Sequence, residues 1–228
     1  MTEGIERSGY FGSKAASGLF QNIIALMPAH ETYIETHLGG GAVMMRKPSA
    51  INNIGIDIDP QVLTDFACDY PVRLVNDCAH HFLANYDYCG AELIYCDPPY
   101  LVQTRTSRRK YRFEYTEQDH IELLERLKSL SCPVILSGYP STLYDALLGD
   151  WNTLELQAMT RGGVRTEKLW FNYTIDRGHW ASYAGKNFTD RQRIKRKAQR
   201  WQKKYRGLPK AERLAILAAM MAVESETA

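Results

Sequence analysis

Two kinds of hydrophobic pattern alternate along the chain. Short runs of apolar and β-branched residues are typical of buried strands, whereas apolar residues that recur every three or four positions indicate amphipathic helices. The strand-like segments are residues 32–38, 53–60, 72–77, 92–97, 133–138, 151–159 and 167–174. The last two predict a closing antiparallel hairpin. Because the other strands alternate with helices, we expect an α/β fold with a mostly parallel, doubly wound sheet and ligands beyond the carboxyl ends of its strands.

The helical segments are marked by their ends as well as by their spacing. Apolar residues at helical spacing run from Leu19 to Met27, and Pro28 ends that helix. Thr116 and Asp119 are capping signals at the start of another helix. Ala42 also follows a glycine run, so we expect a helix to begin there and to cross over to the next strand.

The last 40 residues differ chemically from the rest. Residues 1–188 carry 17 Lys and Arg against 22 Asp and Glu, whereas residues 189–228 carry 11 against 4. A narrow apolar stripe from Ile194 to Leu208 lies among nine cations, and Gly207 and Pro209 separate it from a second helical segment. We therefore expect a globular domain over residues 1–178 and a basic helical hairpin over residues 179–228.

Composition excludes several classes of protein. The chain has 228 residues with 45% hydrophobic content, enough for one substantial core. It contains no apolar stretch of membrane-spanning length and no signal-peptide core, so we expect a cytoplasmic protein that does not associate with membranes. Its five cysteines are odd in number and form no CxxC pair. Neither a metal site nor a disulfide framework is therefore expected.

The most distinctive stretch is Asp97-Pro98-Pro99-Tyr100, which ends a buried strand. Tandem prolines cannot donate to a sheet ladder, so the corner is stiff. It offers an acceptor-only carboxylate beside a flat ring, which suits a planar amino group on a stacked base. The alternative is an Asp-Pro turn with a core tyrosine.

Three other features precede this corner and lie at predicted strand ends. A glycine run, Gly39–Gly41, lets a ligand approach the backbone closely. Asp57 follows the second strand, where ribose hydroxyls bind in nucleotide-type sheets, and Asp77 follows the third.

Together these elements resemble the Dam-like N6-adenine DNA methyltransferases, in particular compact phage-type members. The resemblance covers Tyr10 to about Tyr173 and also includes the Tyr10–Lys14 opening. It implies a Rossmann-like S-adenosylmethionine-dependent methyltransferase fold, S-adenosyl-L-methionine as cofactor, and DNA as substrate. The enzyme would methylate the N6 amino group of an adenine flipped out of the duplex.

The resemblance also implies site residues. Asp97, Pro98, Pro99 and Tyr100 would be catalytic and would hold and stack the target adenine. Cofactor-binding residues would be Tyr10, Lys14, Glu35, Gly39, Gly41, Asp57, Ile58, Asp77 and Asp97. Thr36 and His37 stand where the family usually has proline and phenylalanine, and His37 is either a polar neighbour of the cofactor or a satisfied structural histidine.

Few residues are available to read a DNA sequence. Only 19 residues separate Asp77 from Asp97, where many relatives insert a target-recognition domain. The DNA-binding candidates are Arg105, Arg108, Arg109, Lys110, Arg112, Lys195, Arg196 and Lys203. Arginines and lysines pair most readily with phosphates, so we expect short or relaxed specificity. The alternative is that Arg105, Arg108 or Arg109 reads guanine.

Two other functions remain open at this point. One is an RNA adenine or cytosine-N4 methyltransferase of the same fold, and the other is a non-catalytic DNA-binding protein. The sequence also leaves open whether the chain is a monomer or a homodimer.

Overall fold

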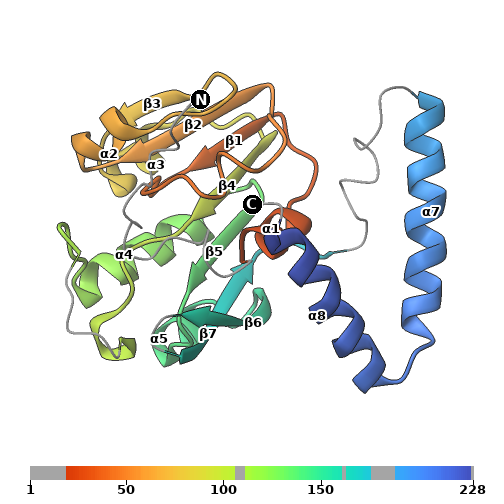
Figure 1. Cartoon of the computed structure of the whole chain (residues 1–228). Helices are drawn as coiled ribbons and strands as arrows, with labels where there is room; N and C mark the ends of the chain where they lie inside the picture. Colours follow the sequence, from red (N-terminus) through yellow and green to blue (C-terminus); the bar gives the residue numbers. More distant parts are fainter. Residues whose placement is uncertain (1–18, 106–110, 161–162, 176–187, 227–228) are drawn as a thin grey trace, which may run out of the picture. The chain divides into compact units, whose positions relative to one another are not determined.

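The computed structural model describes residues 19–105, 111–160, 163–175 and 188–226, which fall into two compact units (Figure 1). The first unit ends at Thr174 and excludes Ile24–Ala29. The second comprises Ile24–Ala29 together with the chain from Ile175 onward. The predicted domain boundary between residues 178 and 179 lies outside the described residues. No helix among the described residues is long and apolar enough to span a bilayer.

The first unit is built on a seven-stranded sheet with the order β3-β2-β1-β4-β5-β7-β6. Its strands are β1 (Thr32–Glu35), β2 (Asn52–Asp57), β3 (Arg73–Asn76), β4 (Glu92–Cys96), β5 (Val134–Gly138), β6 (Asn152–Thr160) and β7 (Gly163–Phe171). Strands β1 to β5 pair in parallel, whereas β7 runs antiparallel to β5 and to β6. This sheet confirms the predicted Rossmann-like α/β fold with its closing antiparallel hairpin.

The helices of this unit are α1 (Leu19–Leu26, whose last residues belong to the second unit), α2 (Pro60–Asp65), α3 (Ala79–Asn85), α4 (Glu117–Lys128) and α5 (Thr142–Leu147), with a short 3-10 helix, η2, at Val102–Thr104. Helix α1 precedes the first strand, and the other helices of this unit lie between strands. Thr116 and Asp119 form the predicted capping box at the start of α4. Helix α4 packs against both α3 and α5.

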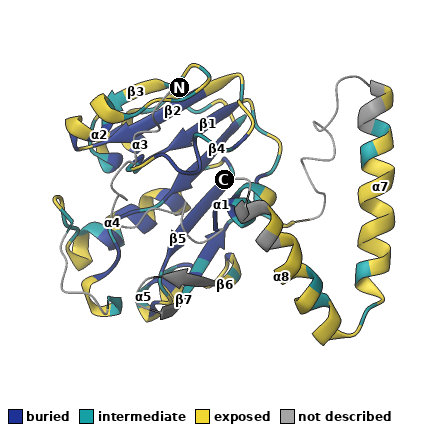
Figure 2. Cartoon of the chain, in the orientation of Figure 1, coloured by how far each residue is buried: buried dark blue, intermediate teal, exposed yellow. Residues whose placement is uncertain are grey.

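The core lies between the central strands and the helices α3, α4 and α5 (Figure 2). Alternate residues of β2, β4 and β5 face it, among them Ile94 and Cys96 of β4. They meet leucines of α4, including Leu123 and Leu127. Because side chains alternate along a strand, Tyr95 of β4 points to the opposite face of the sheet. That face is also buried, since all five residues of β4 and of β5 are buried.

The crossover helix expected after Gly41 was a wrong prediction. Residues 42–47 form turns instead, in which the Met45 N–H donates to the Gly41 carbonyl. Two features stop a helix here. Pro48 follows at once, and the buried Lys47 ammonium donates to the Pro48 carbonyl and to Asn53 Oδ1. The strand expected over residues 32–38 likewise ends at Glu35, where the chain turns toward the glycines.

The second unit contains two helices, α7 (Phe188–Arg206) and α8 (Lys210–Glu226). The turn between them lies at Gly207–Pro209, as the sequence predicts. The Tyr205 hydroxyl donates a 2.8 Å hydrogen bond to the Arg213 carbonyl and joins the two helices near this turn. The basic positions of α7 whose side chains are described are exposed (Figure 2).

Candidate active site

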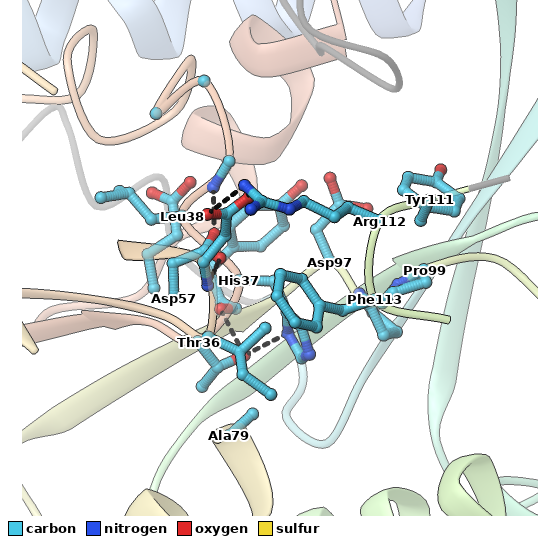
Figure 3. Close-up of a pocket in the computed structure, with 18 of the residues that line it drawn as sticks. Thr36, His37, Leu38, Asp57, Ala79, Asp97, Pro99, Tyr111, Arg112 and Phe113 are labelled. Carbon is cyan, nitrogen blue, oxygen red and sulfur yellow. Dashed lines mark hydrogen bonds and ion pairs between the residues drawn. The ribbon is translucent and has the colours of Figure 1, made fainter. Parts of the chain in front are cut away.

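A pocket opens at the carboxyl ends of β1, β2 and β4, where parallel strands end together (Figure 3). Its walls are the loops after these strands, the start of α3, and four residues from a later segment: Tyr111, Arg112, Phe113 and Tyr115. The predicted site residues that line it are Glu35, Gly39, Gly41, Asp57, Ile58, Asp97, Pro98, Pro99 and Arg112. Residues from distant parts of the sequence thus meet at the edge of the sheet where ligands bind in such folds.

The glycine loop forms one wall. Gly39 and Gly41 have φ angles of 47° and 61°, a region that side chains disfavour. A Cβ on Gly41 would clash with the Phe66 ring, so this position also lacks space. The loop is held to β2 because the Leu38 N–H donates to the Ile56 carbonyl at 2.8 Å.

Asp57 ends β2 and faces the loop. Its Oδ2 accepts a 2.8 Å hydrogen bond from the Gly39 N–H, and its Oδ1 accepts one of 2.9 Å from the Asp59 N–H. Burial raises the pKa of the Asp57 carboxyl, although these backbone bonds oppose that shift. Ile58, which is 45% exposed, lines the pocket beside it. The site therefore offers an acidic group next to an apolar surface.

Glu35 is a buried carboxyl at the end of β1. It accepts a 3.0 Å hydrogen bond from the Tyr33 hydroxyl. Burial raises the pKa of Glu35 to about 8, the Tyr33 bond opposes the shift, and the charge of Asp97 adds to it. Glu35 is thus mostly protonated at neutral pH, so Glu35 and Asp97 do not both carry a full negative charge in the pocket.

Asp97 lies at the end of β4, with Pro98 and Pro99 beside it in the pocket wall. Its Oδ1 accepts a 2.9 Å hydrogen bond from the Ser137 hydroxyl of β5. The same Ser137 oxygen lies 3.0 Å from the Tyr95 hydroxyl. The carboxylate is therefore anchored by side chains of two neighbouring strands.

Tyr100 does not lie among the pocket-lining residues of the described chain. Its hydroxyl donates to both carboxylate oxygens of Glu167, at 3.1 and 2.9 Å. Tyr100 is 6% exposed, and its ring meets the Tyr139 ring edge-on, with a centroid separation of 4.5 Å. The structure thus brings Asp97, Pro98 and Pro99 together and packs Tyr100 behind them.

Asp77 is also absent from the lining, although its neighbours Cys78 and Ala79 belong to it. One Asp77 oxygen accepts from the Cys78 N–H at 2.8 Å, and the other lies 2.8 Å from His81 Nδ1. Asp77 therefore shapes the start of α3 behind the wall formed by Cys78 and Ala79.

Tyr115 is a pocket residue that sequence reasoning missed. Its hydroxyl lies 3.0 Å from His37 Nε2 and 3.3 Å from His80 Nδ1, so it links the loop after β1 to α3. His37 Nδ1 meets Thr36 Oγ1 at 2.9 Å, and burial lowers the pKa of His37 to about 3. His37 is thus a bonded, neutral histidine that also lines the pocket. Nothing in the sequence pattern marks contacts between residues 78 positions apart.

The basic residues after β4 differ in their surroundings. Arg105 is held inside the protein, because its guanidinium donates to both Glu114 oxygens at 2.8 and 2.6 Å and to the Tyr100 carbonyl. Its side chain is only 6% exposed, so it does not fit the expected contact with DNA. Arg112 has a 68% exposed side chain and pairs with Asp59 at 2.9 Å on the pocket rim.

Other candidates cannot be placed at the pocket. Tyr10 and Lys14 lie outside the described residues, as do Arg108, Arg109 and Lys110. Lys195, Arg196 and Lys203 are exposed positions on α7 of the second unit.

Comparisons with known proteins find similarity at the level of structure alone. No family model and no curated protein matches the sequence. Similar solved structures include M. capricolum TrmK in complex with S-adenosyl-homocysteine, with 9% identity, coverage of 91% of this chain and 96% of that chain, and a TM-score of 0.46. The 23S rRNA methyltransferase ErmE shares 10% identity over 71% of this chain and 69% of its own, with a TM-score of 0.45. A putative O-methyltransferase from Klebsiella pneumoniae shares 13% identity over 74% and 83%, with a TM-score of 0.46.

Proposed function

We propose that this protein is an S-adenosylmethionine-dependent methyltransferase that modifies the N6 amino group of adenine in DNA. One observation carries the proposal. The Asp97-Pro98-Pro99 corner shares a single pocket with the glycine loop and with the Asp57 carboxylate. A group that accepts amino hydrogens therefore lies beside a surface suited to a nucleoside-containing cofactor, and the resemblance to Dam-like enzymes rests on the same residues.

The residues of the pocket fit S-adenosylmethionine. Asp57 presents a carboxylate that can accept hydrogen bonds from ribose hydroxyls, and Ile58 provides adjoining apolar surface. At Gly39 and Gly41 the backbone can approach a ligand without side chains. When bound, the cofactor would supply a methyl group on a positively charged sulfur.

The chemical task of the protein is to prepare the adenine nitrogen. That nitrogen is a poor nucleophile because its lone pair is delocalised into the ring. The Asp97 carboxylate and the Pro98 carbonyl would accept hydrogen bonds from the N–H groups of this nitrogen and favour its pyramidal form. The Asp97 carboxylate can also take the proton that the nitrogen loses. The remaining contribution is alignment of the two reactants and exclusion of water.

DNA would be held mainly through its phosphates. Lys195, Arg196 and Lys203 lie on a helix with nine Lys and Arg residues, and Arg112 is a separate exposed cation on the pocket rim. Adenine in a duplex must also leave the base stack to reach the pocket, which costs a few kcal/mol. Because these contacts go to the DNA backbone, the recognised sequence would be short or the specificity relaxed.

Methyl transfer from a labelled cofactor tests the proposal. Purified protein is incubated with DNA, RNA and a mixture of proteins, and the digested nucleosides are analysed by mass spectrometry. N6-methyladenine in DNA is the expected product. Label in RNA, or in N4-methylcytosine, would show that the substrate is RNA or cytosine instead of adenine in DNA. A protein that binds DNA but shows no calorimetric binding of S-adenosylmethionine would be a non-catalytic DNA-binding protein.

A further inference from the structure

We propose that Ser137 and Tyr95 are positioning residues for Asp97, and that they determine which atom of this side chain faces the target amino group. The inference rests on the proposed function, because it concerns how Asp97 meets its substrate. The relevant feature is a row of three polar groups, the Tyr95 hydroxyl, the Ser137 hydroxyl and the Asp97 carboxylate, named here the β4–β5 relay.

The relay is built into the centre of the sheet. Strands β4 and β5 pair in parallel, with Tyr95 opposite Ile135. Ser137 is two residues further along β5, so it lies on the same sheet face as Tyr95 and one step closer to the carboxyl edge. Ser137 is fully buried and Tyr95 is 1% exposed. Hydroxyls buried to this extent are held by their hydrogen-bond partners rather than by water.

The hydrogen bonds of the relay have only one consistent direction. An ionised carboxylate accepts but cannot donate, so Ser137 gives its single hydrogen to Asp97 Oδ1 at 2.9 Å. The Ser137 oxygen must then accept from the Tyr95 hydroxyl, 3.0 Å away. Burial raises the pKa of Tyr95 well above its usual value, so this hydroxyl keeps its hydrogen. Both donors therefore point toward Asp97.

This direction has a chemical consequence for the pocket. Ser137 fixes Oδ1, so the side chain of Asp97 is oriented before the substrate arrives, and in the proposed complex Oδ2 would be the oxygen that accepts from the amino group. An asparagine at this position would be oriented too. The Ser137 hydroxyl would donate to the amide oxygen of the asparagine and turn the amide NH2 group toward the pocket. That NH2 group and the adenine amino group are both donors and could not hydrogen-bond to each other.

Reversal of the relay would leave the Tyr95 hydroxyl hydrogen without an acceptor. Among the described residues, Ser137 is the only hydrogen-bond partner found for that hydroxyl. A buried donor without a partner is unfavourable, so Tyr95 opposes the reversed arrangement. Tyr95 thus supports Ser137 even though it does not contact Asp97 itself.

The first experiment measures methyl transfer by single variants. Because Ser137→Ala removes a hydrogen bond to a charged group, it should lower kcat by about 10- to 100-fold, with cofactor affinity unchanged. Ser137→Thr retains the hydroxyl and should restore most of kcat. Ser131→Ala, at an exposed serine, is the matched control, and thermal melting checks that each variant is folded. Wild-type kcat in Ser137→Ala would overturn the proposal, as would an effect expressed only in KM.

The second experiment tests orientation with a double variant. Asp97→Asn should be nearly inactive while Ser137 is present, because its NH2 group faces the substrate. Adding Ser137→Ala frees the amide to present its oxygen, so Asp97→Asn/Ser137→Ala should be more active than Asp97→Asn alone. A double variant no more active than Asp97→Asn would overturn the assigned direction.

These outcomes separate the inference from the proposed function. If the wild-type protein transfers no methyl group to DNA, the proposed function fails. If the wild-type protein is active and the serine variants behave like it, only the positioning role of Ser137 and Tyr95 is wrong.

Discussion

The Gly39 N–H donates a 2.8 Å hydrogen bond to Asp57 Oδ2 and thereby ties the glycine loop to the end of β2. Replacing Asp57 by alanine removes this bond together with the proposed ribose contact. We expect Asp57→Ala to weaken binding of S-adenosylmethionine by about 1.5–3 kcal/mol, as measured by calorimetry. Asp65→Ala, on the exposed side of α2, is the control. Unchanged affinity in Asp57→Ala would show that other residues bind the ribose.

A second prediction concerns Asp97, whose proposed partner is the target amino group. Asp97→Ala should abolish methyl transfer to DNA while leaving cofactor binding measurable, because the cofactor's ribose is assigned to Asp57. Activity is followed with labelled S-adenosylmethionine and binding by calorimetry, with the exposed Asp87→Ala as the control. Normal turnover by Asp97→Ala would contradict the assignment of the catalytic corner.

The buried Glu35 predicts a specific pH dependence of stability. Its pKa is raised from 4.5 to about 8 in the folded protein, so the folded state keeps a proton that the unfolded chain releases above pH 4.5. The contribution of Glu35 to the free energy of unfolding therefore falls as the pH rises through this window. Glu35→Gln cannot lose a proton. Relative to wild type, it should gain about 2 kcal/mol in urea unfolding between about pH 6 and pH 8. Parallel stability curves for the two proteins would show that Glu35 is already charged at the lower pH.

The cations of α7 predict a salt dependence. Replacing Lys195, Arg196 and Lys203 together by glutamine should weaken DNA binding and reduce the slope of log K against log salt by about 0.9 for each phosphate that the variant no longer neutralises. Fluorescence anisotropy at several salt concentrations measures both quantities. Arg126→Gln/Lys128→Gln on α4 is the matched surface control. An unchanged slope in the α7 variant would remove this helix from the DNA interface.

Specificity is the fifth prediction. Arg105 is bound to Glu114, which leaves it poorly placed to read a base. We expect methylated adenines to occur in many sequence contexts when genomic DNA treated with limiting enzyme is sequenced. Modification confined to one fixed motif would contradict relaxed specificity, and substitutions at Arg108 and Arg109 would then be expected to change that motif.

Local pattern was sufficient for the sheet but not for the first crossover. The runs that form β2, β4 and β5 are apolar and short, and their burial on both faces follows from helices and further chain covering the sheet. The segment after Gly41 resembles a helix start, yet Pro48 and the buried Lys47 impose turns. Pro48 is visible in the sequence as a helix breaker, whereas the burial of Lys47 is decided by the folded structure and has no local signature.

The site was partly predictable for a similar reason. Gly39, Asp57 and Asp97 stand at strand ends, and parallel strands bring their ends together. The contact between Ser137 and Asp97 joins residues 40 positions apart, and the contact between Tyr115 and His37 joins residues 78 positions apart. Strand register and loop path decide these contacts, and a local sequence motif predicts neither of them.

Arg112 connects two regions of the proposed function. It pairs with Asp59 on the pocket rim and is largely exposed to solvent, so the same guanidinium lines the proposed cofactor pocket and would be accessible to a phosphate of the proposed DNA substrate. If DNA engages Arg112, the two proposed binding equilibria are thermodynamically linked through this ion pair. Any change in cofactor affinity that bound DNA causes through Arg112 must be matched by an equal change in DNA affinity when the cofactor is bound.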